Sequence, residues 1–414
     1  MKPFSLKNDM LLGAALPATQ CLGGEIESSW VYWWGLGYVR DHASPAVAAQ
    51  HTAHWREDAA LLRVLGAQTV RLGVDWTRLE PREEAFDEAE LERIREELSA
   101  LKAAGLRVTL ELHRFTNPMW FEEKGGFERE ENLSCYLGCI ERVAAYVGDL
   151  VDEYLTFAEP NAYAVGGYLG GDYPPGKNNP SACYRVLTHM AECHILAYDR
   201  LKQVHEAMDF PPARVGVSLR ARELVTANVH SAAQRLLVAT ARQGFDAAFR
   251  AFYLGQTRLP MKYNRYVVPG KYCDFLALDW YGRMDVSEPL DLTPFARRSG
   301  MGSPKALLAL LNRLHALAPL PVHLTLAGVE DGERVDLLAS YLAALSRSPL
   351  PIERCIYAPL LDGFEWLDGN GKRLGLVRVD FETQARTVKR SGEFFRAIAQ
   401  KRGADEALLA EYGG

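Results

Sequence analysis

The stretch QTVRLGVDWTRLEPREEAFDEAELERIREELSALKAAGLRVTLELH, residues 68–113, contains a strand, a helix and a second strand in that order. Residues 68–74 and 107–113 are short apolar runs with β-branched residues, whereas residues 88–105 carry apolar side chains three and four positions apart. The helical pattern stops at Gly105, a residue that commonly ends helices. Apolar strands that alternate with an amphipathic helix favour parallel pairing, so this unit predicts an α/β fold.

The same alternation recurs along the whole chain. A strand is predicted in each of six further runs, and each is followed by a helical stretch: 11–16, 153–159, 214–220, 274–281, 321–328 and 355–361. Eight such units fit a closed (β/α)8 TIM barrel. An open doubly wound sheet is the main alternative, but no Gly-x-Gly-x-x-Gly turn follows the first strand and there is no phosphate loop. We therefore expect one (β/α)8 barrel domain over residues 1–414.

Composition limits the classes of partner. With 48% hydrophobic and 24% charged residues the chain can bury a large core, and its net charge of −6 offers no polycationic surface for nucleic acid or anionic lipid. No stretch reaches the roughly 18 apolar residues of a membrane-spanning helix. The apolar run near the N-terminus is short and has no convincing cleavage site, so a cytoplasmic location is expected. A homo-oligomer is a possibility that the sequence leaves open.

The seven cysteines do not form the pattern of a small disulfide-rich secreted fold, so reduced thiols are expected. Cys135 and Cys139 lie one helical turn apart. No second cysteine pair or nearby histidine completes a zinc site, which favours packing over metal binding. We expect no metal and no cofactor.

In parallel barrels, catalytic residues gather at the carboxyl ends of the strands, where loops vary without disturbing the packed interior. Glu159 in TFAEPN ends an apolar strand, where burial would raise its pKa and suit it to act as a general acid; a salt bridge to a barrel arginine is the structural alternative. Glu365 lies between Phe364 and Trp366, an arrangement that suits a sugar with apolar faces and hydroxyl edges. Polar candidates at these strand ends are Gln20, Arg71, Arg114, Glu159, Asp279, Tyr281 and Glu365.

Taken together, these stretches resemble glycoside hydrolase family 1, the β-glucosidase family. The likeness extends over essentially the whole chain and lies in LLGAALPATQ, REDAALLRVLGAQTVRLGVDWTRLEP, HRFTNP, TFAEPN, DFLALDWY and LLDGFEW. It implies the (β/α)8 barrel and the hydrolysis of β-glycosides with retention by two glutamates about 5 Å apart. A small-molecule carbohydrate or glycoside is the partner that the resemblance implies.

The resemblance assigns the acid/base role to Glu159, in the family's Asn-Glu-Pro motif. The nucleophile of the family's Thr-Glu-Asn-Gly motif should stand between Thr325 and Gly328, where this chain has Leu326. Leucine cannot attack an anomeric carbon. Loss of about five powers of ten in rate, about 7 kcal/mol of barrier, is the expected cost unless something replaces the nucleophile. Glu330 and Asp331, a few residues further on, are expected to cap a helix.

Further departures from the family affect the same sugar subsite. Ala158 replaces the Asn that holds the 2-hydroxyl, and Ala358 replaces a Trp. Alignment of HRFTNP on its Pro places Arg114 at the family's His; a shift of one residue would place His113 there, and otherwise His113 is expected to be a core histidine. The residues that match sugar-binding positions are Gln20, Glu365, Trp366, Tyr281 and Arg71.

Without the nucleophile, Arg71 loses its usual partner and is expected to lie near Arg114. Two buried cations are unfavourable unless an anion joins them, and Glu159, Asp279 or an anionic ligand could do so. Asp279 stands where the family usually carries Asn. It is either a structural partner of Arg71 or a relocated catalytic carboxylate.

Two functions of different class follow from these residues. The first is a glycosidase that acts on a small β-glycoside or a modified, possibly anionic, sugar, with Glu159 as acid/base and a nonstandard mechanism; Asp279 is its second candidate catalytic residue. The second is an inactive sugar-binding or regulatory barrel. Gln20, Arg71 and Arg114 belong to the substrate-binding set in either case, together with His113, Tyr281, Glu365 and Trp366.

Overall fold

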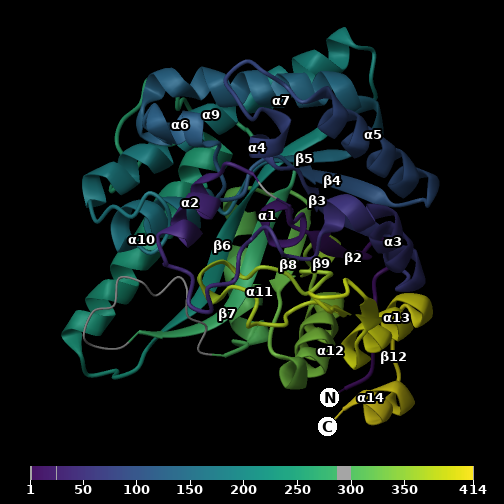
Figure 1. Cartoon of the computed structure of the whole chain (residues 1–414). Coiled ribbons are helices and arrows are strands. Elements are labelled where there is room, and N and C mark those ends of the chain that lie inside the picture. Colours follow the sequence, from purple (N-terminus) through teal and green to yellow (C-terminus); the bar gives the residue numbers. More distant parts are fainter. Residues whose placement is uncertain (1, 25, 287–299, 414) are drawn as a thin grey trace.

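The eight predicted strands form a closed barrel in the computed structural model, which describes residues 2–24, 26–286 and 300–413 (Figure 1). All neighbouring strands in the barrel are parallel and follow chain order. The predicted (β/α)8 barrel is therefore confirmed. The strands are β2 (Leu11–Leu16), β3 (Thr69–Gly73), β4 (Arg107–Glu111), β5 (Glu153–Ala158), β6 (Arg214–Thr226), β7 (Leu276–Val286), β8 (Val322–Ala327) and β9 (Ile352–Ala358).

Helices surround the barrel because each presents one apolar face to the strands (Figure 1). The longer helices are α3 (His51–Val64), α5 (Glu88–Ala103), α7 (Leu133–Val147), α9 (Pro180–Ala207), α10 (Ala232–Leu254), α11 (Pro304–Leu317), α12 (Asp331–Arg347) and α13 (Arg390–Lys401). Shorter helical segments include α1 (Ala18–Cys21), α2 (Ser29–Gly35), α4 (Trp76–Leu79), α6 (Met119–Glu123), α8 (Pro160–Ala164), η4 (Val165–Gly170) and α14 (Glu406–Tyr412).

Three strands differ from their predicted bounds by three residues or more at one end. The strand β9 begins at Ile352 and ends at Ala358, before Pro359, because proline has no N–H with which to continue the ladder; the predicted run 355–361 was therefore placed too late. The strands β6 and β7 continue together past the predicted residues 220 and 281, with Thr226 paired to Val286 at the far end. The paired residues 222–226 of β6 and 282–286 of β7 are called the β6–β7 extension. They project beyond the other strands of the barrel.

The two ends of the described chain meet at one side of the molecule (Figure 1). The strand β1 (Phe4–Ser5) pairs antiparallel with β12 (Gly403–Ala404). A second short pair, β10 (Val377–Val379) with β11 (Arg386–Val388), packs near the last helices. All seven cysteines are free, as expected for packing residues.

A buried histidine links α3 to α5. His51 lies between Asp58 Oδ2 and Glu97 Oε1, at 2.8 Å from each. Burial alone would lower the pKa of His51, but the neighbouring charges and hydrogen bonds of Glu97 and Asp58 outweigh it and raise the pKa to about 9. The imidazolium therefore holds two helices of the outer layer together at neutral pH.

Candidate functional site

The carboxyl ends of the barrel strands bring distant residues into one buried cluster. Arg71 comes from β3 and Arg114 from the segment after β4. Glu159 follows β5, and both Asp279 and Tyr281 come from β7. Because parallel strands all end at the same side of a barrel, residues separated by more than 200 positions in the sequence come into contact here.

Glu159 is the centre of this cluster. It is fully buried and adopts a left-handed backbone conformation, with φ of 59°, at the start of α8. Its Oε1 accepts hydrogen bonds from Arg114 Nη2 and from the Tyr281 hydroxyl, both at 2.8 Å. Its Oε2 accepts from Arg220 Nε. Both carboxylate oxygens are thus occupied by donors from three different parts of the chain.

Arg220 is a member of the cluster that sequence reasoning missed. It lies on β6, and its guanidinium carbon lies 4.2 Å from the centre of the Tyr281 ring. It is the last residue of the predicted strand 214–220, so the rule about strand ends could have found it. The family motifs drew attention to other strands instead. Glu159 therefore forms ion pairs with two arginines, Arg114 at Oε1 and Arg220 at Oε2.

The second half of the cluster is built around Arg71. Its Nη1 lies 2.6 Å from Asp279 Oδ1, and its Nε lies 2.6 Å from Glu111 Oε2. Asp279 Oδ2 also accepts from Ser218 Oγ at 2.8 Å. Burial would raise the pKa of Asp279, but the charge and hydrogen bonds of Arg71 outweigh it and lower the pKa. Asp279 is therefore held as an ionised partner of Arg71.

Charge is balanced across the two halves. The expected single anion between Arg71 and Arg114 is not seen among the described residues; instead each arginine has its own carboxylate, Asp279 for Arg71 and Glu159 for Arg114. The ion pairs of the cluster involve three arginines and three carboxylates: Arg71, Arg114, Arg220, Glu111, Glu159 and Asp279. No external anion is needed to neutralise these arginines.

Gln20 and Glu365 form a separate polar pair beside the cluster. Gln20 Nε2 donates to Glu365 Oε2 at 2.9 Å. Within the described residues, the Oε1 atoms of both side chains are buried without a hydrogen-bond partner, and so is Arg114 Nε. Burial raises the pKa of Glu365 to about 8, although Arg114 opposes the shift. Buried polar atoms without partners are rare and indicate a place where a ligand can bind.

Trp366 is tied into an aromatic wall. It is 7% exposed, and its ring centre lies 4.7 Å from that of Trp30 and 4.9 Å from that of Phe115. Phe115 in turn lies below the guanidinium of Arg220, at 5.4 Å. The wall therefore connects the residues around Glu365 to the arginines around Glu159.

His113 is not brought into the cluster. Its Nε2 lies 2.8 Å from Asn117 Oδ1, and its ring is surrounded by Phe127, Tyr136, Phe157 and Tyr163. Burial lowers the pKa of His113 to about 4, so the ring is neutral at physiological pH. These contacts are those of a core histidine. Arg114, the next residue, contacts Glu159 instead.

Leu326 is 1% exposed and belongs to the main hydrophobic core. The preceding residue, Thr325, points into the barrel, where its hydroxyl accepts a hydrogen bond from Arg71 at 3.0 Å. Leu326 pairs in register with Trp280, whose indole donates to the Tyr341 hydroxyl of the outer helix α12. None of the six residues of β8 is acidic.

The acidic residues just after β8 do not replace a nucleophile. Asp331 pairs with Arg334 at 2.8 Å, and its side chain is 64% exposed. Glu330 lies 3.6 Å from Lys372 and is equally exposed. Both residues stand at the start of α12, but the side chain of Glu330 makes no capping hydrogen bond there, contrary to the expected cap. Among the described residues, no group of three or more His, Cys, Asp or Glu side chains is placed to hold a metal ion.

Comparison with known proteins agrees with this architecture. The family model described as Glycosyl hydrolase family 1 matches residues 5–265 and 322–404. The chain belongs to this family. A search of the helices in the described residues finds none long and apolar enough to cross a bilayer.

Relatives within the family are distant in sequence, but each of those named here aligns with most of this chain. A beta-glucosidase of Agrobacterium sp. is 26% identical over 94% of both chains. A chloroplastic galactolipid galactosyltransferase of Arabidopsis thaliana is 27% identical, over 86% of this chain and 60% of its own length. The solved structure of a beta-glycosidase from Pyrococcus horikoshii covers all of this chain with a TM-score of 0.87 at 26% identity.

Proposed function

We propose that this family 1 barrel binds a sugar and does not hydrolyse it by the usual two-glutamate route. The observation that supports this proposal is the environment of Glu159. A general acid must present a proton to a leaving group, but both oxygens of Glu159 already accept hydrogen bonds from arginines or Tyr281. Neither oxygen can reach a leaving group unless an arginine moves away.

We infer that no carboxylate among the described residues replaces the second glutamate of the usual mechanism. Leu326 occupies the family's nucleophile position, as inferred from the sequence match. Asp279, the candidate for a relocated nucleophile, has both oxygens bound, by Arg71 and by Ser218. We assign Asp279 the role of neutralising Arg71, which has lost its usual partner.

The proposed ligand is a neutral sugar. The arginines of the cluster are balanced by carboxylates of the chain, so they favour an anionic sugar less than the sequence suggested. Gln20 and Glu365, by contrast, have buried oxygens that lack partners. Neighbouring hydroxyls of one sugar ring are suited to satisfy them, and Trp366 with Phe115 provides the apolar side of the site.

A second candidate function is a glycosidase with a nonstandard mechanism. It is favoured by the presence of Glu159 at the family's acid/base position and by relatives named beta-glucosidase and galactosyltransferase. In this case Glu159 acts as acid/base after Arg114 or Arg220 has been displaced by the substrate. An acidic group on the sugar would be the natural competitor for those arginines.

The test is to measure binding and turnover side by side. Calorimetric titration with glucose, galactose and glucuronate is combined with a turnover assay on the matching nitrophenyl β-glycosides. The proposal predicts binding of a neutral sugar, at least tenfold weaker binding in Glu365→Ala and in Gln20→Ala, and no turnover. The surface substitution Glu382→Ala is the matched control and should bind as the parent protein does.

The second candidate predicts different results. Turnover that disappears in Glu159→Gln would establish the glycosidase and overturn the binding proposal. A preference for glucuronate that is lost in Arg114→Gln would show that the ligand is anionic. Absence of binding to every sugar, in a protein that is shown to be folded, would contradict both functions.

A further inference from the structure

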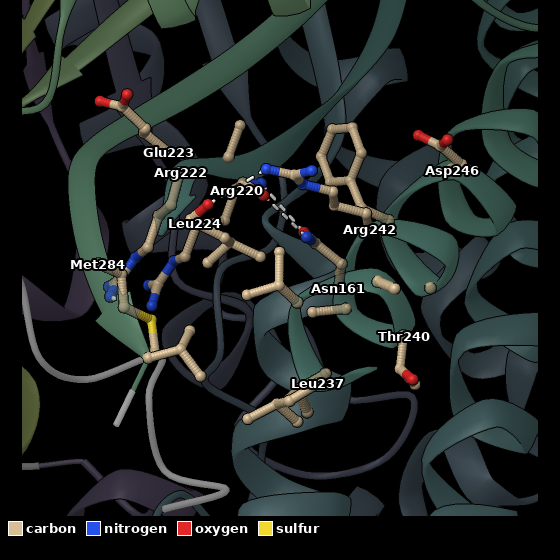
Figure 2. Close-up of a pocket in the computed structure, with 18 of the residues that line it drawn as sticks. Asn161, Arg220, Arg222, Glu223, Leu224, Leu237, Thr240, Arg242, Asp246 and Met284 are labelled. Atoms are coloured by element: carbon tan, nitrogen blue, oxygen red, sulfur yellow. Dashed lines mark hydrogen bonds between the residues drawn. The ribbon is translucent and has the colours of Figure 1, made fainter. Parts of the chain in front are cut away.

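A large cavity lies on the flank of the barrel, outside the cluster around Glu159. It has a volume of about 1370 Å³, is open on one side, and is lined by residues of the β6–β7 extension, α9, α10, α11 and η4. Typical small-molecule pockets measure roughly 300–1,000 Å³, so this one is large enough for an extended ligand. Of its lining residues, only Asn161 and Trp280 come from the stretches that resemble the family. Figure 2 shows 18 of the residues that line it.

One wall of the cavity is apolar. Val238, Met284 and Val286 form a small hydrophobic cluster of their own, separate from the main barrel core, with Leu224 and Leu237 packed against it. All five residues line the cavity. Because they come from α10 and from both strands of the extension, they form a continuous surface that an alkyl chain could contact along its length.

Arginines stand at the edge of this apolar wall. Arg235 and Arg242, both exposed on α10, line the cavity and donate to backbone carbonyls, at 2.6 Å to Val229 and 3.2 Å to Leu224. Arg222 lies on the opposite side, beside Met284 (Figure 2). Of the acidic residues that line the cavity, Asp246 pairs with Arg313, and Glu223 accepts from Ser303 N at 2.9 Å. Arg235 and Arg242 therefore bring two positive charges to the edge of the wall.

The inner end of the cavity reaches Arg220. The backbone of this residue is fixed by Asn161, whose amide group makes two hydrogen bonds to it, at 2.9 and 3.0 Å (Figure 2). The Arg220 side chain points the other way, to Glu159. The cavity and the sugar site are therefore separated by a single residue, but they are lined by different side chains.

We propose that this flank cavity binds a single-chain amphiphile with an anionic head, such as a long-chain carboxylate. The alkyl chain lies along Leu224, Leu237, Val238, Met284 and Val286, and the head contacts the arginines of α10. This site does not depend on sugar binding at Gln20 and Glu365. An apolar wall with cations on one edge matches such a molecule in both shape and charge.

Titration of the full-length protein with octanoate, decanoate and dodecanoate, below their micellar concentrations, tests the site. Transfer of each CH₂ group from water to an apolar wall strengthens binding by at most about fourfold, so affinity should rise steadily with chain length. Dodecanol, which lacks the charge, should bind at least fivefold more weakly than dodecanoate. Equal affinities for the two would overturn the assignment of an anionic head.

Variants locate the bound chain. Leu237→Trp fills the cavity and should weaken dodecanoate binding at least tenfold; Leu224→Trp is a second variant that fills it from β6 instead of α10. Leu236→Trp is the matched control, because Leu236 is 69% exposed on the same helix and does not line the cavity. If the filled variants bind dodecanoate as tightly as the control, the chain lies elsewhere and the proposal is wrong.

The charge of the edge is tested separately. Arg235→Ala with Arg242→Ala should reduce affinity for dodecanoate at least fivefold and leave affinity for dodecanol unchanged. Arg63→Ala, an exposed arginine on α3, is the control. Equal losses for both ligands would show that the arginines support the fold of α10 and do not bind the head.

Discussion

Replacement of Glu365 by glutamine should make the protein more resistant to alkaline pH. Burial raises the pKa of Glu365 from 4.5 to about 8, so the folded protein binds this proton more tightly than the unfolded chain does. The resulting stability is complete below pH 4.5 and is lost as the pH rises through 8. Between pH 5 and pH 9 the two pKa values give a loss of about 4 kcal/mol in the free energy of unfolding.

Glutamine mimics the neutral form of the carboxyl group. Its amide oxygen can accept the hydrogen bond of Gln20 Nε2, and its charge does not change with pH. Unfolding by urea, followed by circular dichroism at pH 5 and pH 9, measures the difference between Glu365→Gln and the parent. We expect this difference to be close to zero at pH 5 and about 4 kcal/mol in favour of the variant at pH 9.

Glu382→Gln is the control for this experiment. Glu382 is exposed at the surface, so its replacement should change stability equally at both pH values. Comparison of variants with the parent at each pH cancels every other titrating group. An identical difference at pH 5 and pH 9 for Glu365→Gln would refute the reasoning, because it would mean that burial does not keep this carboxyl neutral.

Three further substitutions test the buried charges. Glu159→Gln leaves Arg114 and Arg220 without their carboxylate and should lower the free energy of unfolding by about 3 kcal/mol or more, measured by urea unfolding. The raised pKa of His51 stabilises the fold fully below pH 6.5, and this stabilisation is lost as the pH rises through about 9. His51→Gln should therefore lower the melting temperature at pH 6 and leave it nearly unchanged at pH 10. Leu326→Glu should give no glucosidase activity and a lower melting temperature, because it places a carboxylate at a position that is 1% exposed.

The barrel could be predicted from the sequence because its strands and helices are marked locally. Apolar periodicity, Gly105 at a helix end and the family motifs placed eight strands in the right order. The β6–β7 extension could not be predicted in this way. Residues 222–226 and 282–286 are stabilised as strands by pairing with each other. No pattern within either segment indicates that the other segment is its partner.

The sequence indicated many residues of the candidate site, but it did not indicate which of them contact one another. Gln20, Arg71, Asp279 and Glu365 were selected from the sequence, and the structure brings Arg71 to Asp279 and Gln20 to Glu365. The pairing of Glu159 with both Arg114 and Arg220 joins three strand ends, so it depends on the closed barrel rather than on any one motif. Arg220 was overlooked because the family resemblance directed attention to positions that the family already uses.

The charge of Arg71 is balanced inside the barrel, on the side of β8 opposite to Leu326. Thr325 points inward to Arg71, whereas Leu326 pairs in register with Trp280, whose indole donates to Tyr341 of α12, so Leu326 faces the outer helices. A glutamate at 326 would therefore be buried beside Trp280 and would not reach Arg71, which already has Glu111 and Asp279 as partners. The double variant Leu326→Glu with Asp279→Asn should accordingly be less stable than Leu326→Glu alone, because it also removes a carboxylate from Arg71. A double variant more stable than Leu326→Glu would show that the glutamate does reach Arg71 and takes the place of Asp279.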